Sequence, residues 1–266
     1  VILLALAVGA LISLPIMAGP LPVAKSKNAE AQKLINQAKS LEKKDSNAPI
    51  YKECISLLEK ANQLDPENPE ILIELARYQW NYGNNLPKET EQQQEKLEEI
   101  YEKGLDYADQ SLDIKESAGA HYWFAVNKAA SLEFSSIFSQ AAGFPSIYSH
   151  SEKVGEMDEQ YYYGASGRLW SEVLTRVPKK VVELVNWDVQ EAMDDIDKAI
   201  KIEPRYLDNY VYKARFIYTY FDDKQEALKL LEHALSQDAE TIMPEEVTAN
   251  KVSQRDGKEL WKKSKE

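Results

Sequence analysis

The chain has 266 residues and a formal net charge of −12 at pH 7, with 44% hydrophobic and 29% charged residues. This composition is typical of a folded soluble protein and excludes an intrinsically disordered one. The acidic balance disfavours nucleic-acid binding, because that needs a cationic face to release counterions from the phosphates.

The amino-terminal 24 residues carry no charge, and Val1 to Leu14 is almost entirely apolar. Such a segment is typical of a signal peptide or a membrane anchor. Fourteen apolar residues suit a signal peptide, while residues 1–18 approach the shortest membrane span, so both readings of residues 1–24 stay open. We expect an exported protein, periplasmic or envelope-associated, that meets a membrane only through residues 1–18 if they are uncleaved.

Helical patterns begin at residues 29–44 and 51–64. In the second pattern, Cys54, Leu58 and Ala61 are spaced 0, 4 and 7, so they share one helix face. Small residues at such positions let two helices cross closely. The single cysteine of the chain is therefore expected to be a packed core residue, and it cannot form an internal disulfide.

The next helical patterns lie at 69–82, 97–114 and 119–138. The repeat spacing then lapses over residues 139–185, which we interpret as a helical insertion with a break at Gly143 and Pro145. Any specialised function is expected in this middle section.

Residues 186–239 contain the most regular spacing. Ala192, Ile196 and Ala199 share a helix face, and the same spacing recurs 35 residues later at Ala227 and its partners. That period and pattern are typical of tetratricopeptide-like helical hairpins. The sequence predicts an all-α solenoid of such hairpins, with a single repeat domain at 25–243 and a charged tail or capping helix at 244–266.

Candidate chemistry is sparse. None of the three histidines, His121, His150 and His233, is spaced with another His or Cys as a metal-ligand pair. No nucleophile elbow, phosphate-binding glycine loop or dinucleotide fingerprint is present. We therefore expect neither an enzyme nor a cofactor or metal.

An acidic cluster occurs in the regular repeat, at Glu191, Asp194, Asp195 and Asp197. Carboxylates in such density are able to bind calcium, but the glycine spacing of a calcium loop is missing. Solvated charge on the outer face of a helix is the preferred interpretation.

The aromatic residues, with 15 Tyr and 5 Trp, are the main candidate for a binding function. Core filling explains most of them. The alternative is a groove that accepts an apolar ligand or a partner segment. The residues predicted to line it are Tyr122, Trp123, Phe134, Tyr162, Trp170 and Tyr210.

Two motifs in the middle section carry a family resemblance, Ala-His-Tyr-Trp-Phe-Ala at 120–125 and Gly-Arg-Leu-Trp at 167–170. Together with the hairpins around them, the chain resembles the TatT family, the T component associated with tripartite ATP-independent periplasmic (TRAP) transporters. The resemblance implies a periplasmic helical protein that forms a small homo-oligomer. Its members are commonly lipoproteins, and the absence of a cysteine after the apolar segment departs from that.

The resulting prediction is a non-enzymatic periplasmic adaptor, accessory to a TRAP-type transport system. Its expected partners are a periplasmic solute-binding protein or another envelope protein, with a hydrophobic small molecule as a further candidate ligand. The alternative is an envelope-anchored tetratricopeptide scaffold for protein–protein interaction without a transport role.

Overall fold

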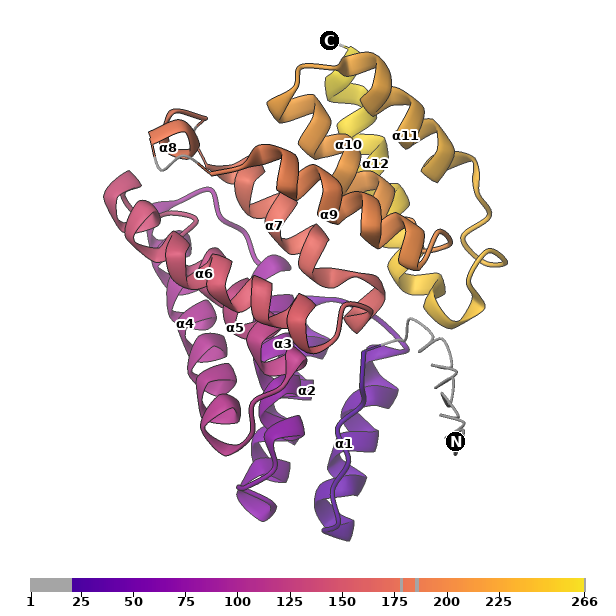
Figure 1. The fold of residues 1–266 in the computed structure, drawn as a ribbon. Helices are drawn as coiled ribbons and strands as arrows, with labels where there is room; N and C mark the ends of the chain where they lie inside the picture. Colours follow the sequence, from indigo (N-terminus) through magenta and orange to yellow (C-terminus); the bar gives the residue numbers. More distant parts are fainter. Residues whose placement is uncertain (1–20, 178, 185–186, 266) are drawn as a thin grey trace, which may run out of the picture.

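The computed structural model describes residues 21–177, 179–184 and 187–265, so most of the predicted export segment lies outside the described residues. In the described part the regular structure is helical, which confirms the all-α prediction (Figure 1). The elements are α1 (Ala29–Glu42), α2 (Ala48–Leu64), α3 (Pro69–Asn84), α4 (Glu91–Ile114), α5 (Ala118–Ser131), α6 (Ile137–Met157), η1 (Tyr161–Tyr163), α7 (Ala165–Arg176), α8 (Lys179–Leu184), α9 (Val189–Ile202), α10 (Asp208–Tyr220), α11 (Lys224–Ser236), η2 (Pro244–Glu246) and α12 (Val247–Lys265).

Side-chain caps define where many helices begin. Asn28, Asn47 and Asn68 precede α1, α2 and α3, and each side-chain oxygen accepts a hydrogen bond from a backbone N–H of the first turn. At the start of α4, Thr90 and Gln93 form a reciprocal capping box. These contacts satisfy backbone donors that a helix start leaves without intrahelical partners.

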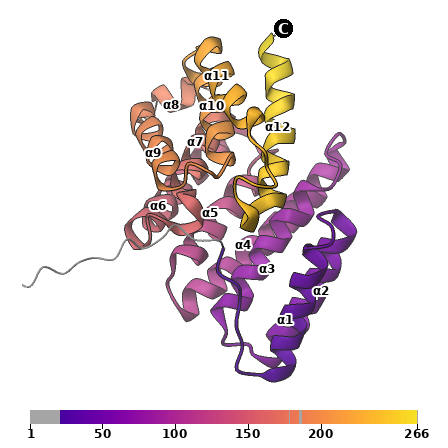
Figure 2. The ribbon, with the colours of Figure 1, turned by 90° about the vertical axis from the view of Figure 1, so that its right-hand side faces the viewer.

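The helices stack as successive hairpins. The pairs are α1 with α2, α3 with α4, α5 with α6, α7 with α9, and α10 with α11, and α12 covers the last pair. Figure 2 shows α12 running alongside this carboxyl-terminal pair. The array is the solenoid that the repeat spacing predicts.

The small residues of the repeat face inward, as predicted. Ala192, Ile196 and Ala199 are each at most 1% exposed, and the matching residues of α11 are fully buried. The contact between α7 and α9 is especially close, because a Cβ atom built on Gly167 would lie 2.4 Å from the carbonyl oxygen of Asp195. Only glycine permits that approach.

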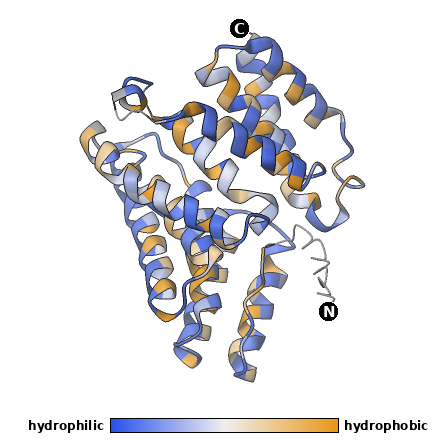
Figure 3. Ribbon diagram, viewed as in Figure 1, coloured by the Kyte–Doolittle hydropathy of each residue, from blue (hydrophilic) through white to orange (hydrophobic). Residues whose placement is uncertain are grey.

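Hydrophobic and hydrophilic residues alternate along the helices (Figure 3). The buried hydrophobic residues gather in separate cores. One core joins α1, α2 and α3, and it contains the buried Cys54. A second fills the centre around Trp123 and Trp170. A third joins α10, α11 and α12, where Leu260 of α12 is 8% exposed.

The middle section differs from the sequence prediction at one point. Helix α6 runs unbroken from Ile137 to Met157 although Pro145 lies inside it, so the predicted break at Gly143 and Pro145 is wrong. Proline removes one helical hydrogen bond, but its fixed φ is compatible with a helix. Pro145 is exposed, so its ring lies at the solvent side of α6.

Candidate functional site

Four of the six predicted groove residues belong to the central core, namely Tyr122, Trp123, Tyr162 and Trp170. Tyr122 and Trp123 lie edge to face at 4.9 Å between ring centroids, and Tyr162 lies 6.3 Å from Tyr122. Tyr122 and Trp123 are 9% and 3% exposed, so both rings serve mainly as packing. Their burial leaves little of either ring on a binding surface.

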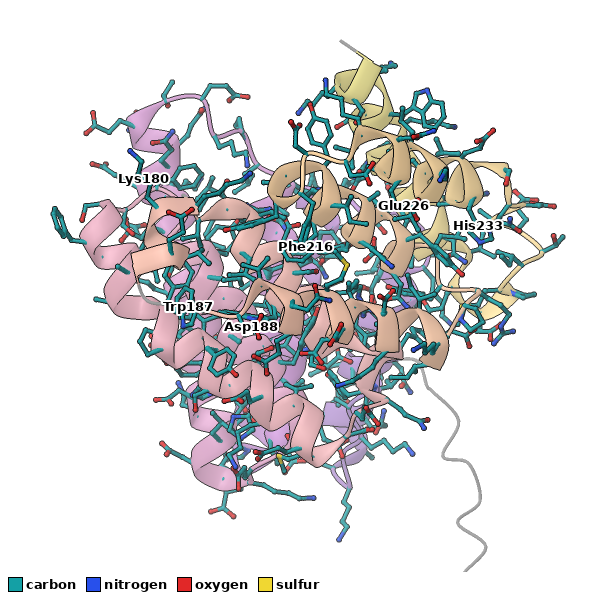
Figure 4. All side chains as sticks on the ribbon, turned by 45° about the horizontal axis from the view of Figure 1, so that its top comes forward. Lys180, Trp187, Asp188, Phe216, Glu226 and His233 are labelled. Carbon is teal, nitrogen blue, oxygen red and sulfur yellow. The ribbon has the colours of Figure 1, made fainter. Side chains whose placement is uncertain are left out.

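Trp170 lies in another part of that core, buried against Tyr148 and Trp187 with ring centroids at 4.8 and 5.3 Å. The other two predicted residues, Phe134 and Tyr210, lie outside this core. Phe134 lies in the turn after α5, where the Lys88 ammonium is 6.0 Å from its ring. Tyr210 belongs to the carboxyl-terminal core and packs on His233 of α11, which Figure 4 labels. The six residues therefore do not form one continuous groove.

Arg168 of α7 is the centre of a buried polar cluster. Its guanidinium donates hydrogen bonds to the carbonyl oxygens of Tyr162 and Tyr163 and to Asn209 Oδ1, at 2.5, 2.9 and 2.6 Å. Its Nε lies 3.9 Å from the carboxylate of Asp208. Burial raises the pKa of Asp208, while the Arg168 charge acts to lower it. Because the guanidinium is committed to partners within the chain, this cluster is structural.

The cluster holds an unusual backbone. Tyr162 and Tyr163 have φ values of 43° and 59°, in the left-handed region that costs a non-glycine residue about 1–2 kcal/mol. Side-chain contacts fix them there. Tyr206 donates a hydrogen bond to Tyr162 Oη at 2.9 Å, and Tyr163 donates to Glu246 at 3.1 Å. This segment thereby ties the middle of the chain to the start of α12.

Two further charged networks are neutralised within the chain. Burial acts to raise the pKa of Glu42, but the adjacent Arg77 guanidinium lowers it to about 2. Arg77 also pairs with Glu74. In the other network, the carboxylate of Glu172 contacts Arg215 at 2.6 Å and Arg176 at 2.8 Å. Neither network leaves an uncompensated acid or base for catalysis.

Two histidines meet between α5 and α6. His121 Nδ1 lies 2.9 Å from His150 Nδ1, and His121 Nε2 lies 3.0 Å from the carboxylate of Glu116. The His150 ring stacks on Phe124 with 3.8 Å between centroids. Burial and the neighbouring His121 lower the pKa of His150 to about 4. The sequence did not predict this pair, because its members are 29 residues apart.

A groove of about 300 Å³ lies between α6, α7 and α9, and we call it the α6–α9 groove. Its rim carries carboxylates from two helices, and one predicted residue, Trp170, contributes to its lining. The sequence did not single out Glu152 and Glu156 of α6, or Glu159 in the turn after it. The spacing of four residues places Glu152 and Glu156 on one helix face, and that signal was available.

Within residues 21–177, 179–184 and 187–265, no group of three or more His, Cys, Asp or Glu side chains is arranged to hold a metal ion. None of the helices in these same ranges combines the length and apolarity that crossing a bilayer requires.

Comparisons with known proteins agree with this architecture. The family model for regulator of microtubule dynamics protein 1-3 matches residues 29–263. The expected membership of the TatT family is therefore wrong, and the transporter role that it implied loses its basis. The two motifs behind that expectation lie in helices whose aromatic and small residues serve packing, which unrelated helical repeats share. None of the curated proteins matches the chain.

A solved structure supports the repeat fold. The chain is similar to TTC0263, a thermophilic TPR protein of Thermus thermophilus, with a TM-score of 0.60 and 15% sequence identity. The similarity covers 85% of this chain and 98% of that one. This confirms tetratricopeptide-like helical hairpins.

Proposed function

The chain belongs to the family of regulator of microtubule dynamics proteins 1-3, and from that premise we propose that it is a non-enzymatic adaptor that binds partner proteins. The observation that carries the proposal is the continuous stack of hairpins from α1 to α12. Stacked repeats expose a long surface relative to their core, which suits contact with extended segments of another protein.

The pairing of acidic side chains with arginines inside the protein supports an adaptor rather than an enzyme. An active site commonly holds an acid or base whose pKa is displaced toward neutrality. Here the buried carboxylates Glu42 and Glu172 are paired with arginines that lower the pKa of each. These groups stabilise the fold and stay ionised near pH 7, so they are poor proton donors.

The family name supplies the class of process. Its members are called regulators of microtubule dynamics, and we extend that role to this chain. We propose that the partners include proteins that act on microtubules, so the array connects them rather than carrying out a reaction. Export or membrane anchoring by residues 1–18 stays a prediction, and it would determine the compartment in which the chain binds its partners.

Affinity purification from the native host tests the adaptor role. Residues 25–266 serve as bait after brief cross-linking, with an unrelated acidic helical-repeat protein of similar size as the control bait. We expect partner proteins, including ones that act on microtubules, to be enriched over the control. Equal recovery on both baits would rule out the adaptor role. If the enriched partners have no effect on microtubule growth or shortening, the adaptor role would stand and the proposed connection with microtubules would be rejected.

A further inference from the structure

The α6–α9 groove has a strongly one-sided charge. Glu152 and Glu156 of α6 and Glu159 in the turn after it lie on one side, and Glu191 and Asp195 of α9 lie on the other. One ammonium shares the lining, that of Lys198, and its Nζ pairs with Asp195 at 3.0 Å. Outside the lining, Lys153 pairs with Glu156 at 2.7 Å. The excess of negative charge that the lining does not balance therefore belongs to Glu152, Glu159 and Glu191.

The two acidic sides converge on one hydroxyl group. Tyr148 donates to the two carboxylate oxygens of Glu191 at 3.4 and 3.5 Å, so it bridges α6 and α9. Burial raises the pKa of Tyr148, and hydrogen bonding to Glu152 and the charge of Glu191 raise it further. The Tyr148 hydroxyl has one proton to donate, and two carboxylates, those of Glu152 and Glu191, face it. The repulsion between these two negative charges favours the binding of a cation.

The floor of the groove is apolar and closely packed. Trp170 is 3% exposed and lies edge to face with Tyr148. Beside it, Gly164 lies so near Ala199 that a Cβ built on the glycine would be 2.7 Å from Ala199 Cα. Above these buried groups, the half-buried Tyr148 and Ile202 give the lining aromatic and aliphatic surface. Such surface beside carboxylates fits a long side chain with methylene groups and a cationic end.

One wall leaves room for an occupant. A Cβ built on Gly155 of α6 meets only Ser166 Oγ, at an ordinary contact distance of 3.7 Å. Gly155 belongs to the groove lining, and its backbone is helical. A Cβ at this position therefore fits without displacing the packed helices, and a larger side chain would add bulk to the groove lining.

We propose that the α6–α9 groove binds a lysine- or arginine-rich segment of a partner protein. The methylene groups of one basic side chain lie on the half-buried Tyr148 ring, and its cation replaces the missing positive charge between Glu152 and Glu191. Neighbouring basic residues pair with the outer carboxylates of α6. The inference rests on the proposed adaptor function, and it names the chemistry of one partner segment.

Binding of a synthetic peptide tests the proposal directly. The probe is a fluorescent peptide of alternating lysine and alanine, with an alternating glutamate and alanine peptide of equal length as the charge control. Its affinity for residues 25–266 is measured by anisotropy at physiological salt. Glu152→Gln with Glu191→Gln should weaken binding about tenfold, which corresponds to about 1.4 kcal/mol. The matched control, Glu99→Gln with Glu102→Gln on the exposed face of α4, removes the same charge and should leave the affinity nearly unchanged.

A steric variant separates the groove from general acidity. Gly155→Leu keeps every charge and favours the helix, so the protein should stay folded by circular dichroism while peptide binding is lost. Equal weakening by the α4 control pair would overturn the groove assignment, as would unchanged binding to Gly155→Leu. Equal binding of the glutamate peptide would overturn the charge assignment.

The partner proteins found with the native bait distinguish the two proposals. Failure of the unaltered bait to enrich any partner rejects the adaptor function. Partners that are captured equally well by Gly155→Leu reject the groove alone, since the adaptor then uses another surface. Loss of a partner with Gly155→Leu supports both.

Discussion

At the scale of single residues, Arg168 shows how a buried cation is retained. Isolated buried charge is costly, and the cost is offset only when the hydrogen-bonding groups are satisfied. Arg168 contacts two carbonyl oxygens of a left-handed turn and the side chain of Asn209. It therefore stabilises a backbone that the tyrosines at 162 and 163 would rarely adopt alone.

Arg168→Met should lower the free energy of unfolding by about 2–4 kcal/mol, because it removes the guanidinium donor from the Tyr162 carbonyl and Asn209 Oδ1 and one of two donors from the Tyr163 carbonyl. Urea denaturation followed by circular dichroism measures the change. Arg255→Met is the control, since Arg255 is 68% exposed and pairs with the neighbouring Asp256. A loss of less than about 1 kcal/mol for Arg168→Met would mean that the turn is held by other contacts.

The pair of His121 and His150 makes stability depend on pH. The folded protein lowers the pKa of His150 from 6.5 to about 4, so the unfolded chain binds a proton that the folded chain rejects. The contribution of neutral His150 to the free energy of unfolding is fully present above pH 6.5 and is lost as the pH falls toward 4.

Unfolding free energies measured between about pH 7.5 and 5 should therefore fall with acidity, and His150→Gln should reduce that slope. The pKa of Glu42 is about 2 in the folded protein and 4.5 in the unfolded chain. Glu42 therefore titrates at lower pH than the range from about 7.5 to 5. His233→Gln on α11 is the matched control and should leave the slope unchanged. Identical slopes for His150→Gln and the unaltered protein would contradict the assignment.

At the scale of elements, close crossing decides how the middle section joins the regular repeat. Gly164 and Gly167 of the α7 region approach Ala199 and Asp195 of α9 so closely that neither glycine has space for a Cβ. Small residues on both partners are what permits this distance. The crossing also sets the width of the α6–α9 groove, since α7 forms its floor.

Ala199→Leu should disturb this crossing first and cost about 1–3 kcal/mol through overpacking. Hydrogen exchange read by mass spectrometry should show faster exchange in α7 and α9 than in α1 to α3. The control is Ala142→Leu, since Ala142 lies on the exposed side of α6. Equal acceleration along the described helices would argue against local cooperativity.

At the scale of the whole molecule, separate cores succeed one another along the array. The core of α1 to α3 has no members in common with the core of α10 to α12 among their buried residues. In such an array each hairpin depends mainly on its neighbours. The last hairpin therefore depends on α12, which buries Leu260 against it.

Removal of residues 247–266 should expose the apolar face of α10 and α11 and speed amide exchange there. Exchange in α1 to α3 should stay within error of the full chain, because that core lies several hairpins away. A uniform acceleration would show that the array unfolds as one cooperative unit. Unchanged exchange in α10 and α11 would show that α12 does not stabilise them.

The spacing of small and apolar residues was enough to predict the helices of the regular repeat and the inward face of α9 and α11. These features depend on residues three to seven apart, and helix geometry places such residues on one face. The spacing did not predict that α5 ends at Ser131, short of the expected helix over 119–138. The same local signal was misleading at Pro145, where an exposed ring allows a helix to continue. The family was also not identified correctly, because the motifs at 120–125 and 167–170 serve helix packing and are not specific to one family.

The candidate sites depend on contacts that no local pattern contains. Spacing puts Glu152 and Glu156 on one face of α6, but the close approach of Gly167 to α9 places them opposite Glu191. Likewise Trp170 reaches the groove while Phe134 and Tyr210 lie in other parts of the array. Residues distant along the chain meet only when whole helices pack, so their shared environment follows from the crossing of helices and not from the order of residues.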